Sequence, residues 1–274
     1  MIMMRYPKGL SKALTLSYDD GVIEDIRLID IMSKHGLKGT FNINSSMMAE
    51  KDATEMRQRL SKKQMLDLYL PSGNEVAVHA YTHAHLEELP PELITEEVLK
   101  DRENIENTFG TITRGMAYPF GTYNDTVVDS LKSCGIAYSR TVESTEWFSI
   151  PTDWLRMPAT CHHANPKLFD LADRFLSLER RVVDPCLLFY LWGHSYEFAL
   201  ADNWDIIEKF AEKMGNRDDI WYATNIEIYD YVQSYNKLRY NIAKTKVHNP
   251  TSIDLWISKD GKIIEIKAGQ TVNI

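Results

Sequence analysis

Residues 13–21 read Ala-Leu-Thr-Leu-Ser-Tyr-Asp-Asp-Gly, an uncharged alternating run that ends in two adjacent carboxylates and a glycine. The alternation predicts a strand, and Gly21 allows a tight backbone turn just after it. Taken alone, the stretch is better explained as a strand with an ordinary Asp-Gly turn. A second stretch, His79-Ala80-Tyr81-Thr82-His83, also follows a strand-like run. Polar residues after two strands favour a site at the end of a barrel or α/β sheet.

The composition favours one large domain, or a domain with a small appendage. The chain has 274 residues, of which 44% are hydrophobic, and a net charge of -8. We therefore expect a substantial core and no nucleic-acid partner. The three cysteines form no Cys-x-x-Cys pair, and no apolar run is long enough to span a membrane. Because residues 1–10 contain no apolar run typical of a signal peptide, we expect a cytoplasmic protein, or a secreted one if a leader was removed.

Strand and helix patterns alternate along the chain about seven times, which predicts a parallel sheet, closed or nearly closed, with helices outside. A segment rich in loop residues, around Trp147 to Pro158, interrupts this order. Residues 1–238 are expected to form the barrel. Residues 239–274 are expected to form a small β appendage, with a hairpin of strands 253–257 and 262–266 around Lys259-Asp260-Gly261.

His79 and His83 are four residues apart, a spacing at which two imidazoles can bind one ion. With a carboxylate they would suit Zn²⁺ or a similar divalent ion. Such a pair is common by chance, so the metal site depends on the barrel bringing Asp19 or Asp20 to the histidines. His85 is interpreted as pointing outward or supporting the site. His162-His163 is interpreted as loop surface that could face substrate.

Five motifs in order resemble those of the polysaccharide deacetylase family, also called the NodB homology domain or carbohydrate esterase family 4. Ser-Tyr-Asp-Asp-Gly at 17–21 resembles the first motif, and His79-x-x-x-His83 the second. Residues 116–121, Met-Ala-Tyr-Pro-Phe-Gly, resemble the third, and Asp153-Trp154 the fourth. Leu-Trp-Gly-His at 191–194 resembles the fifth. The resemblance implies an α/β fold, a distorted (β/α)₇ barrel, and metal-dependent removal of acetyl groups from an N- or O-acetylated carbohydrate.

The resemblance also implies a role for each matching position. The metal, most simply Zn²⁺ with Co²⁺ or Ni²⁺ as alternatives, would be held by Asp20, His79 and His83. Its bound water would attack the acetyl carbonyl, with Asp19 as the base and His194 as the acid that protonates the leaving group. The expected substrate-binding residues are Tyr118, Phe120, Trp154 and Leu191, with the main-chain N–H of Phe120 as an oxyanion donor. Apart from the resemblance, two carboxylates are candidates to support His194: Asp153 could brace it or be an ordinary turn residue, and Glu197 could orient it or simply be exposed.

The sequence departs from the family pattern at Ala117, where the third motif usually carries an arginine that braces the catalytic Asp. We therefore expect Arg140 or Arg156 to supply a guanidinium near Asp19 or Asp153. Two alternative functions stay open: an allantoinase-like cyclic amide hydrolase of the same barrel type, and a catalytically weakened carbohydrate-binding relative. The complete set Asp20, His79 and His83 argues against the first alternative.

Overall fold

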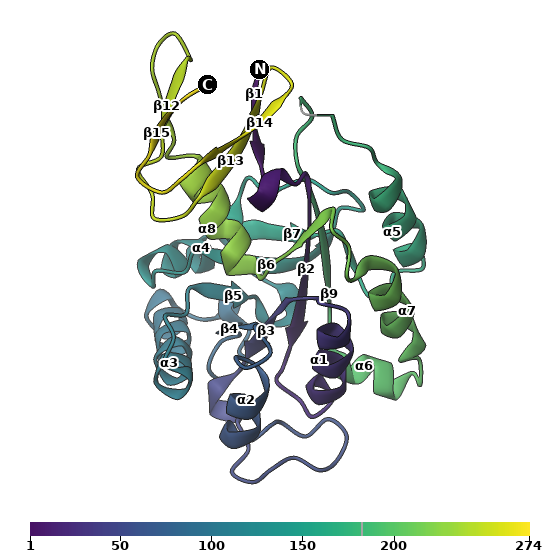
Figure 1. The fold of residues 1–274 in the computed structure, drawn as a ribbon. Coiled ribbons are helices and arrows are strands. Elements are labelled where there is room, and N and C mark those ends of the chain that lie inside the picture. Colours follow the sequence, from purple (N-terminus) through teal and green to yellow (C-terminus); the bar gives the residue numbers. More distant parts are fainter. Residues whose placement is uncertain (182) are drawn as a thin grey trace.

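The computed structural model describes residues 1–181 and 183–274. At its centre is a parallel sheet with the strand order β7-β6-β5-β4-β3-β2-β9-β8, and β10 pairs with the start of β2 (Figure 1). The strands of this sheet are β2 (Lys12–Asp19), β3 (Gly39–Ile43), β4 (Glu75–Val78), β5 (Gly115–Ala117), β6 (Tyr138–Ser144), β7 (Met157–Ala159), β8 (Cys161–His162), β9 (Leu187–Gly193) and β10 (Ile220–Tyr222).

The sheet closes through the short segment 157–162. Its first half, β7, pairs with β6, and its second half, β8, pairs with β9. The residue between the halves, Thr160, donates its N–H to the carbonyl of Tyr190 at 2.8 Å. Segment 157–162 thus occupies one strand position, and the predicted distorted (β/α)₇ barrel is confirmed. The loop expected around Trp147 to Pro158 extends less far than predicted, because β7 already begins at Met157.

Helices cover the outside of the barrel, as the alternation predicted (Figure 1). Helix α6 lies directly after β9. The helices are α1 (Asp25–Lys34), α2 (Lys62–Leu68), α3 (Pro91–Phe109), α4 (Asp125–Ser133), α5 (Leu168–Ser177), α6 (Ser195–Leu200), α7 (Asp205–Met214) and α8 (Asn225–Tyr235). Short 3₁₀ turns occur at Pro7–Gly9, Ser45–Met47, Leu86–Glu88, Pro119–Gly121 and Trp154–Arg156.

The two faces of β2 are both buried but differ in chemistry. Leu14, Leu16 and Tyr18 pack into the apolar core that the helices share. The residues between them, which hydrogen-bond to polar side chains inside the barrel, are Thr15, Ser17 and Asp19. Successive residues of a strand point to opposite faces, so β2 necessarily delivers Asp19 to the barrel interior.

Helix α2 begins with a capping box, for which Ser61-x-x-Gln64 is the typical sequence pattern. The Ser61 hydroxyl accepts the N–H of Gln64 at 3.1 Å, and the Gln64 side chain accepts the N–H of Ser61. We expect Ser61→Ala to lower the free energy of unfolding by about 1–2 kcal/mol, because it removes this cap and a hydrogen bond to Asp52. Urea denaturation measures the effect. Ser133→Ala, at an exposed position, is the control, and equal stability of the two variants would refute the capping role.

The carboxyl-terminal residues form two small antiparallel sheets beside the barrel, near both termini (Figure 1). The predicted hairpin is confirmed: its strands pair through a two-residue turn, Asp260-Gly261, in which both residues have positive φ. Strand β1 pairs with β13, so the sheet crosses the predicted boundary at residue 238. The sheets consist of β1 (Ile2–Arg5), β13 (Leu255–Lys259) and β14 (Lys262–Ile266), and of β11 (Arg239–Tyr240), β12 (Lys246–His248) and β15 (Thr271–Asn273).

Within residues 1–181 and 183–274, the helices are all too short or too polar to cross a membrane.

Candidate functional site

The candidate catalytic side chains lie where strands β2, β4 and β9 of the barrel end. Asp19 is the last residue of β2, His79 follows β4, and His194 follows β9. Because parallel strands end at the same edge of the sheet, these residues meet around a cavity of about 310 Å³. The cavity is lined by Asp19, Asp20, His79, His83, Tyr118, Phe120, Gly121, Val142, Trp192, His194 and Tyr196.

Buried polar groups fix the loop that carries the two histidines. Asp101 of α3 accepts the N–H of His79 at 2.9 Å, and Asn44 donates to the carbonyl of Ala80 at 2.9 Å. One helical turn before Asp101, Glu97 accepts the N–H of Thr82 at 2.8 Å. These supports were not predicted from the sequence. One of these supports, Asn44, had a signal in the sequence. Polar residues occupy every second position along β3 and end at Asn44, which indicates a polar face inside the barrel.

Asp20, His79 and His83 together fit a divalent metal ion. One ligand atom from each residue lies within 4.8 Å of the other two. The Nδ1 of His79 lies 2.8 Å from the carbonyl oxygen of Ala117, so Nδ1 carries the proton and Nε2 keeps its lone pair. Burial lowers the pKa of both histidines, which keeps their rings neutral. One carboxylate and two neutral imidazoles form a donor set that Zn²⁺ accepts.

The Asp20 carboxylate also lies beside a cation that the sequence analysis did not identify. Nη1 of Arg59 is 2.9 Å from Oδ1 of Asp20 and also donates to the Asp20 main-chain carbonyl. The same Oδ1 atom is 3.9 Å from Nε2 of His83. It is buried and has no hydrogen-bond partner of suitable geometry in the described part of the chain. Oδ1 of Asp20 therefore has a lone pair that no hydrogen bond uses and that faces the His83 ring. This supports a candidate metal site at Asp20, His79 and His83.

Asp19 is buried beside a guanidinium and two imidazoles. Its Oδ2 atom pairs with Arg140 and lies 3.9 Å from Nε2 of His79 and 3.8 Å from Nε2 of His194. Its Oδ1 atom accepts a hydrogen bond from Asn42 at 2.8 Å. Burial alone would raise the pKa of Asp19, but the adjacent Arg140 guanidinium outweighs burial and holds this pKa well below its ordinary value. Asp19 is therefore ionised at neutral pH.

The contact between Arg140 and Asp19 confirms the expected replacement for the arginine missing at Ala117. Arg140 lies on β6, and its Cα is the register partner of Ala117 on β5. A guanidinium from the neighbouring strand therefore reaches the Asp that an arginine at position 117 would brace. Arg140 is buried and stacks on the Trp192 ring at 4.4 Å from its centroid.

Left-handed backbone conformations gather at the cavity. The φ angles are 87° at Asp20, 60° at Ala80, 57° at His83 and 57° at Phe120. Side chains other than glycine rarely adopt such angles, and strained positions cluster at functional sites. Gly21 has φ 64°, and a Cβ there would lie 2.9 Å from the Met65 side chain, so the predicted need for glycine is confirmed.

Two of the predicted substrate-binding residues lie away from the cavity. Trp154 packs edge-to-face on Tyr229 of α8 with ring centroids 5.2 Å apart, and Leu191 is fully buried in the core that faces the helices. Trp192 and Val142 line the cavity in their place. Tyr118 and Phe120 line it as expected, and the Phe120 ring stacks on His85 at 3.8 Å.

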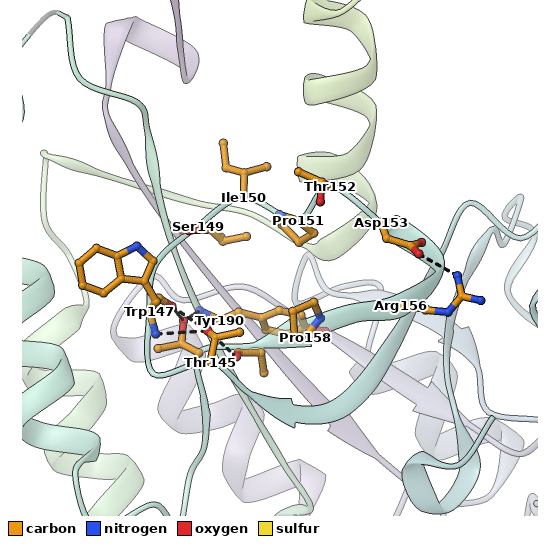
Figure 2. Close-up of a pocket in the computed structure, with 13 residues that line it drawn as sticks. Thr145, Trp147, Ser149, Ile150, Pro151, Thr152, Asp153, Arg156, Pro158 and Tyr190 are labelled. Atoms are coloured by element: carbon orange, nitrogen blue, oxygen red, sulfur yellow. Dashed lines mark hydrogen bonds and ion pairs between the residues drawn. The ribbon is translucent and has the colours of Figure 1, made fainter. Parts of the chain in front are cut away.

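Asp153 and Arg156 form a pair of their own. Nη1 of Arg156 lies 2.8 Å from Oδ2 of Asp153, and Nη2 lies 2.5 Å from Asp125 on α4. Figure 2 shows the first pair beside a separate cavity of about 320 Å³, which Trp147 and Tyr190 also line. The prediction that Arg140 or Arg156 lies near Asp19 or Asp153 therefore also holds for the pair of Arg156 with Asp153. The expected brace between Asp153 and His194 is wrong, because the carboxylate nearest to His194 Nδ1 is Glu197, at 3.4 Å.

The interpretation of His162-His163 as loop surface is also wrong. His162 ends β8, and His163 is only 3% exposed. Both Nε2 atoms face the same oxygen of Glu197, at 3.1 and 3.0 Å. The three residues His162, His163 and Glu197 are called the His–Glu cluster below.

Comparisons with known proteins agree with this fold and its strand-end motifs. The family model of polysaccharide deacetylase matches residues 7–139. The chain is 22% identical over 139 residues to the peptidoglycan-N-acetylglucosamine deacetylase PgdA of Listeria monocytogenes, covering 50% of this chain and 27% of PgdA. It is 23% identical over 151 residues to a chitooligosaccharide deacetylase of Bradyrhizobium, covering 53% of this chain and 60% of that protein.

A solved structure shares the fold over most of the chain. The crystal structure of a putative polysaccharide deacetylase from Mycobacterium smegmatis superposes with a TM-score of 0.59 at 15% identity, covering 85% of this chain and 94% of that one. The chain spans well under two thirds of the length of the curated relatives it matches first. Residues 7–139, just under half of the chain, thus resemble the polysaccharide deacetylase family in sequence, and the solved structure shows that the fold is shared over most of the chain.

Proposed function

We propose that this protein is a metal-dependent hydrolase that removes acetyl groups from an N- or O-acetylated carbohydrate. The observation that carries the proposal is the meeting of an ionised acid, Asp19, and an imidazole, His194, beside one candidate metal triad in a single cavity. The names of the relatives, which include deacetylases of peptidoglycan and chitooligosaccharide, support an acetylated glycan as substrate.

The metal would be held by Asp20, His79 and His83, and the donor set favours Zn²⁺, with Co²⁺ or Ni²⁺ as alternatives. When bound, such an ion acts as a Lewis acid and makes a coordinated water a better nucleophile near neutral pH. The hydrogen bond from Nδ1 of His79 to the Ala117 carbonyl would keep the ring oriented for this role.

The two remaining active groups would move protons. Asp19, kept ionised by Arg140, accepts a proton from the attacking water through Oδ2. His194 presents Nε2 toward the same oxygen at 3.8 Å, so a proton on Nε2 can pass to the leaving amine or alcohol as its bond to the acetyl carbon breaks. Burial lowers the pKa of His194, but Glu197 and Asp19 outweigh this effect and raise it, which favours the protonated ring.

The rest of the cavity would bind the acetyl group and the sugar. The main-chain N–H of Phe120 is the candidate donor to the developing oxyanion. Trp192 and Val142 offer apolar surface for the acetyl methyl. Phe120 is 52% exposed at the rim, where an aromatic ring can pack against a sugar face.

Acetate release from N-acetylglucosamine oligomers and from acetylated xylan tests the proposal. We expect release from at least one of these substrates, loss of release with a chelator, and recovery after Zn²⁺ or Co²⁺ is added. Absence of release from every acetylated glycan, with metal added, would contradict the proposal and favour the binding-protein alternative. Hydrolysis of a cyclic amide instead would favour the allantoinase-like alternative.

A further inference from the structure

The His–Glu cluster lies directly behind His194, on the side away from Asp19. Helix α6 begins at Ser195, so Glu197 in its first turn is held close to His194. Oε1 of Glu197 is 3.4 Å from Nδ1 of His194, and Oε2 accepts the His194 main-chain N–H at 3.3 Å. The ligand-type atoms of the cluster lie within 4.8 Å of one another, so the cluster could in principle be a second metal site or a hydrogen-bond network.

The hydrogen bonds of His162 favour a hydrogen-bond network over a second metal site. Its Nδ1 accepts the main-chain N–H of Ala164 at 3.1 Å, so the lone pair of Nδ1 is already used. In the neutral ring the proton then sits on Nε2, which lies 3.1 Å from Glu197. A metal would need the lone pair of Nε2 and would break the bond from Ala164. His162 is therefore a donor to Glu197 and a poor metal ligand.

His163 donates to the same oxygen from a fixed position. Burial lowers the pKa of His163 to about 4, so the ring is neutral and has one N–H to give. Its Nε2 is 3.0 Å from Oε2 of Glu197, whereas its Nδ1 is buried without a hydrogen-bond partner in the described part of the chain. The tautomer with the proton on Nε2 is thus the one that forms a hydrogen bond.

The backbone beside His163 is built for this ring. A Cβ at Gly193 would lie 2.1 Å from Nδ1 of His163, so only glycine leaves room for the ring against β9. On its other side the ring stacks on Phe198 of α6, with centroids 4.1 Å apart. His163 is therefore locked between β9 and the helix that carries Glu197.

Three donors face one oxygen of Glu197 and stabilise the charged form of its carboxylate: the two imidazole N–H groups and the main-chain N–H of His194. Partial burial alone would raise the pKa of Glu197, but hydrogen bonds from His162, His163 and His194 together lower it. An ionised Glu197 favours a proton on Nδ1 of His194 and leaves Nε2 directed at the cavity. Nδ1 of His194 is buried and has no hydrogen-bond partner of suitable geometry in the described residues. Its 3.4 Å separation from Oε1 of Glu197 is long for a hydrogen bond, as is common for catalytic contacts before substrate binds.

We infer that Glu197, held as an anion by His162 and His163, is the positioning residue for His194. The inference rests on the proposed function in one respect, since it is the proposed acid His194 that Glu197 orients. In the reaction the proton on Nε2 of His194 passes to the leaving nitrogen or oxygen as that atom separates from the acetyl carbon. Glu197 keeps its charge throughout and takes up no proton. Of the two carboxylates that the sequence offered for this role, Asp153 and Glu197, the geometry thus favours Glu197.

Glu197→Gln tests the inference because the amide cannot satisfy all its neighbours. Its oxygen can accept from His194 or from the two imidazoles, and its NH₂ group then faces another N–H donor. For N-acetylglucosamine oligomers or acetylated xylan, whose leaving groups need a proton, we expect kcat to fall roughly 100-fold. For 4-nitrophenyl acetate, whose phenolate leaves unaided, we expect a change below about threefold. Glu208→Gln, an exposed carboxylate paired with Arg27 on the surface, is the matched control.

Nitrogen-15 NMR of the imidazoles provides a readout that does not depend on activity. In the wild-type protein at neutral pH we expect the Nε2–H tautomer for His162 and His163 and a proton on Nδ1 of His194, with loss of this Nδ1 preference in Glu197→Gln. Nδ1–H tautomers at His162 and His163, or shifts of both rings on titration with Zn²⁺ at sub-stoichiometric amounts, would overturn the inference in favour of a metal site. An equal loss of activity on glycan and aryl acetate would overturn it in favour of a purely structural role. If the wild type releases no acetate at all, the proposed function fails, and the tautomers still decide whether Glu197 orients His194.

Discussion

Asp19→Asn is expected to lower acetate release by roughly 10³-fold or more while the protein still binds its metal. The amide cannot accept the proton of the attacking water. Its oxygen can still accept the hydrogen bond from Asn42, but its NH₂ group then faces the guanidinium of Arg140. Steady-state kinetics on an acetylated glycan and calorimetric titration with Zn²⁺ measure the two parts of this prediction.

The adjacent residue provides the control for that experiment. Asp20→Asn makes the same carboxylate-to-amide change at the next residue. We expect it to weaken metal binding, whereas Asp19→Asn leaves metal binding unchanged. Because Asp19→Asn leaves Arg140 buried without its counter-ion, circular dichroism must show that the variant is folded. A folded Asp19→Asn variant with turnover within threefold of the wild type would refute the role of Asp19 as base.

His83→Ala is expected to weaken Zn²⁺ binding by more than 100-fold and to remove activity at metal concentrations that saturate the wild type. His83 is the more exposed of the two candidate imidazole ligands, so its loss perturbs the fold less than loss of the buried His79. Competition with a chromophoric chelator, or the visible absorption of bound Co²⁺, measures the affinity.

His85→Ala is the matched control for His83→Ala. His85 is a histidine two residues further along the chain that stacks on Phe120 and pairs with Glu87, outside the candidate triad. We expect its replacement to change the Zn²⁺ affinity by less than about threefold. Equal affinities in the His83→Ala variant and the wild type would remove His83 from the metal site.

The barrel and the strand-end positions of Asp19, His79 and His194 could be predicted because each follows a strand pattern in the sequence. A parallel barrel brings the carboxyl ends of its strands together, whatever the distance between them along the chain. The capping box at Ser61 and the Asp260-Gly261 hairpin were predictable for a similar reason. Their signals are local, and no tertiary contact has to be known to interpret them.

The lining of the cavity was harder to predict because β9 is buried on both faces. In such a strand every residue is apolar, and hydrophobic alternation does not show which side chains face the barrel interior. The correct face could have been inferred from His194 instead. Trp192 is two residues before His194 and shares its face, whereas Leu191 points to the helices.

Arg140 and the His–Glu cluster were hard to predict from the sequence for two different reasons. Arg140 was one of two candidates, and the choice depended on the register of β5 against β6, which places it beside Ala117. The His–Glu cluster gave no strand signal, because segment 157–162 is split between two neighbours and contains Pro158. Without that closing strand there was no reason to place His162 and His163 behind His194.

The central claim is that Asp20, His79 and His83 hold one divalent ion between Asp19 and His194. A crystal structure of the Zn²⁺-loaded protein, with anomalous data at the zinc edge, tests it most directly. The account predicts a single strong anomalous peak about 2.0–2.2 Å from a carboxylate oxygen of Asp20 and an imidazole nitrogen of each histidine. A fully loaded crystal with no peak there, or with its peak at His162, His163 and Glu197, would contradict the account.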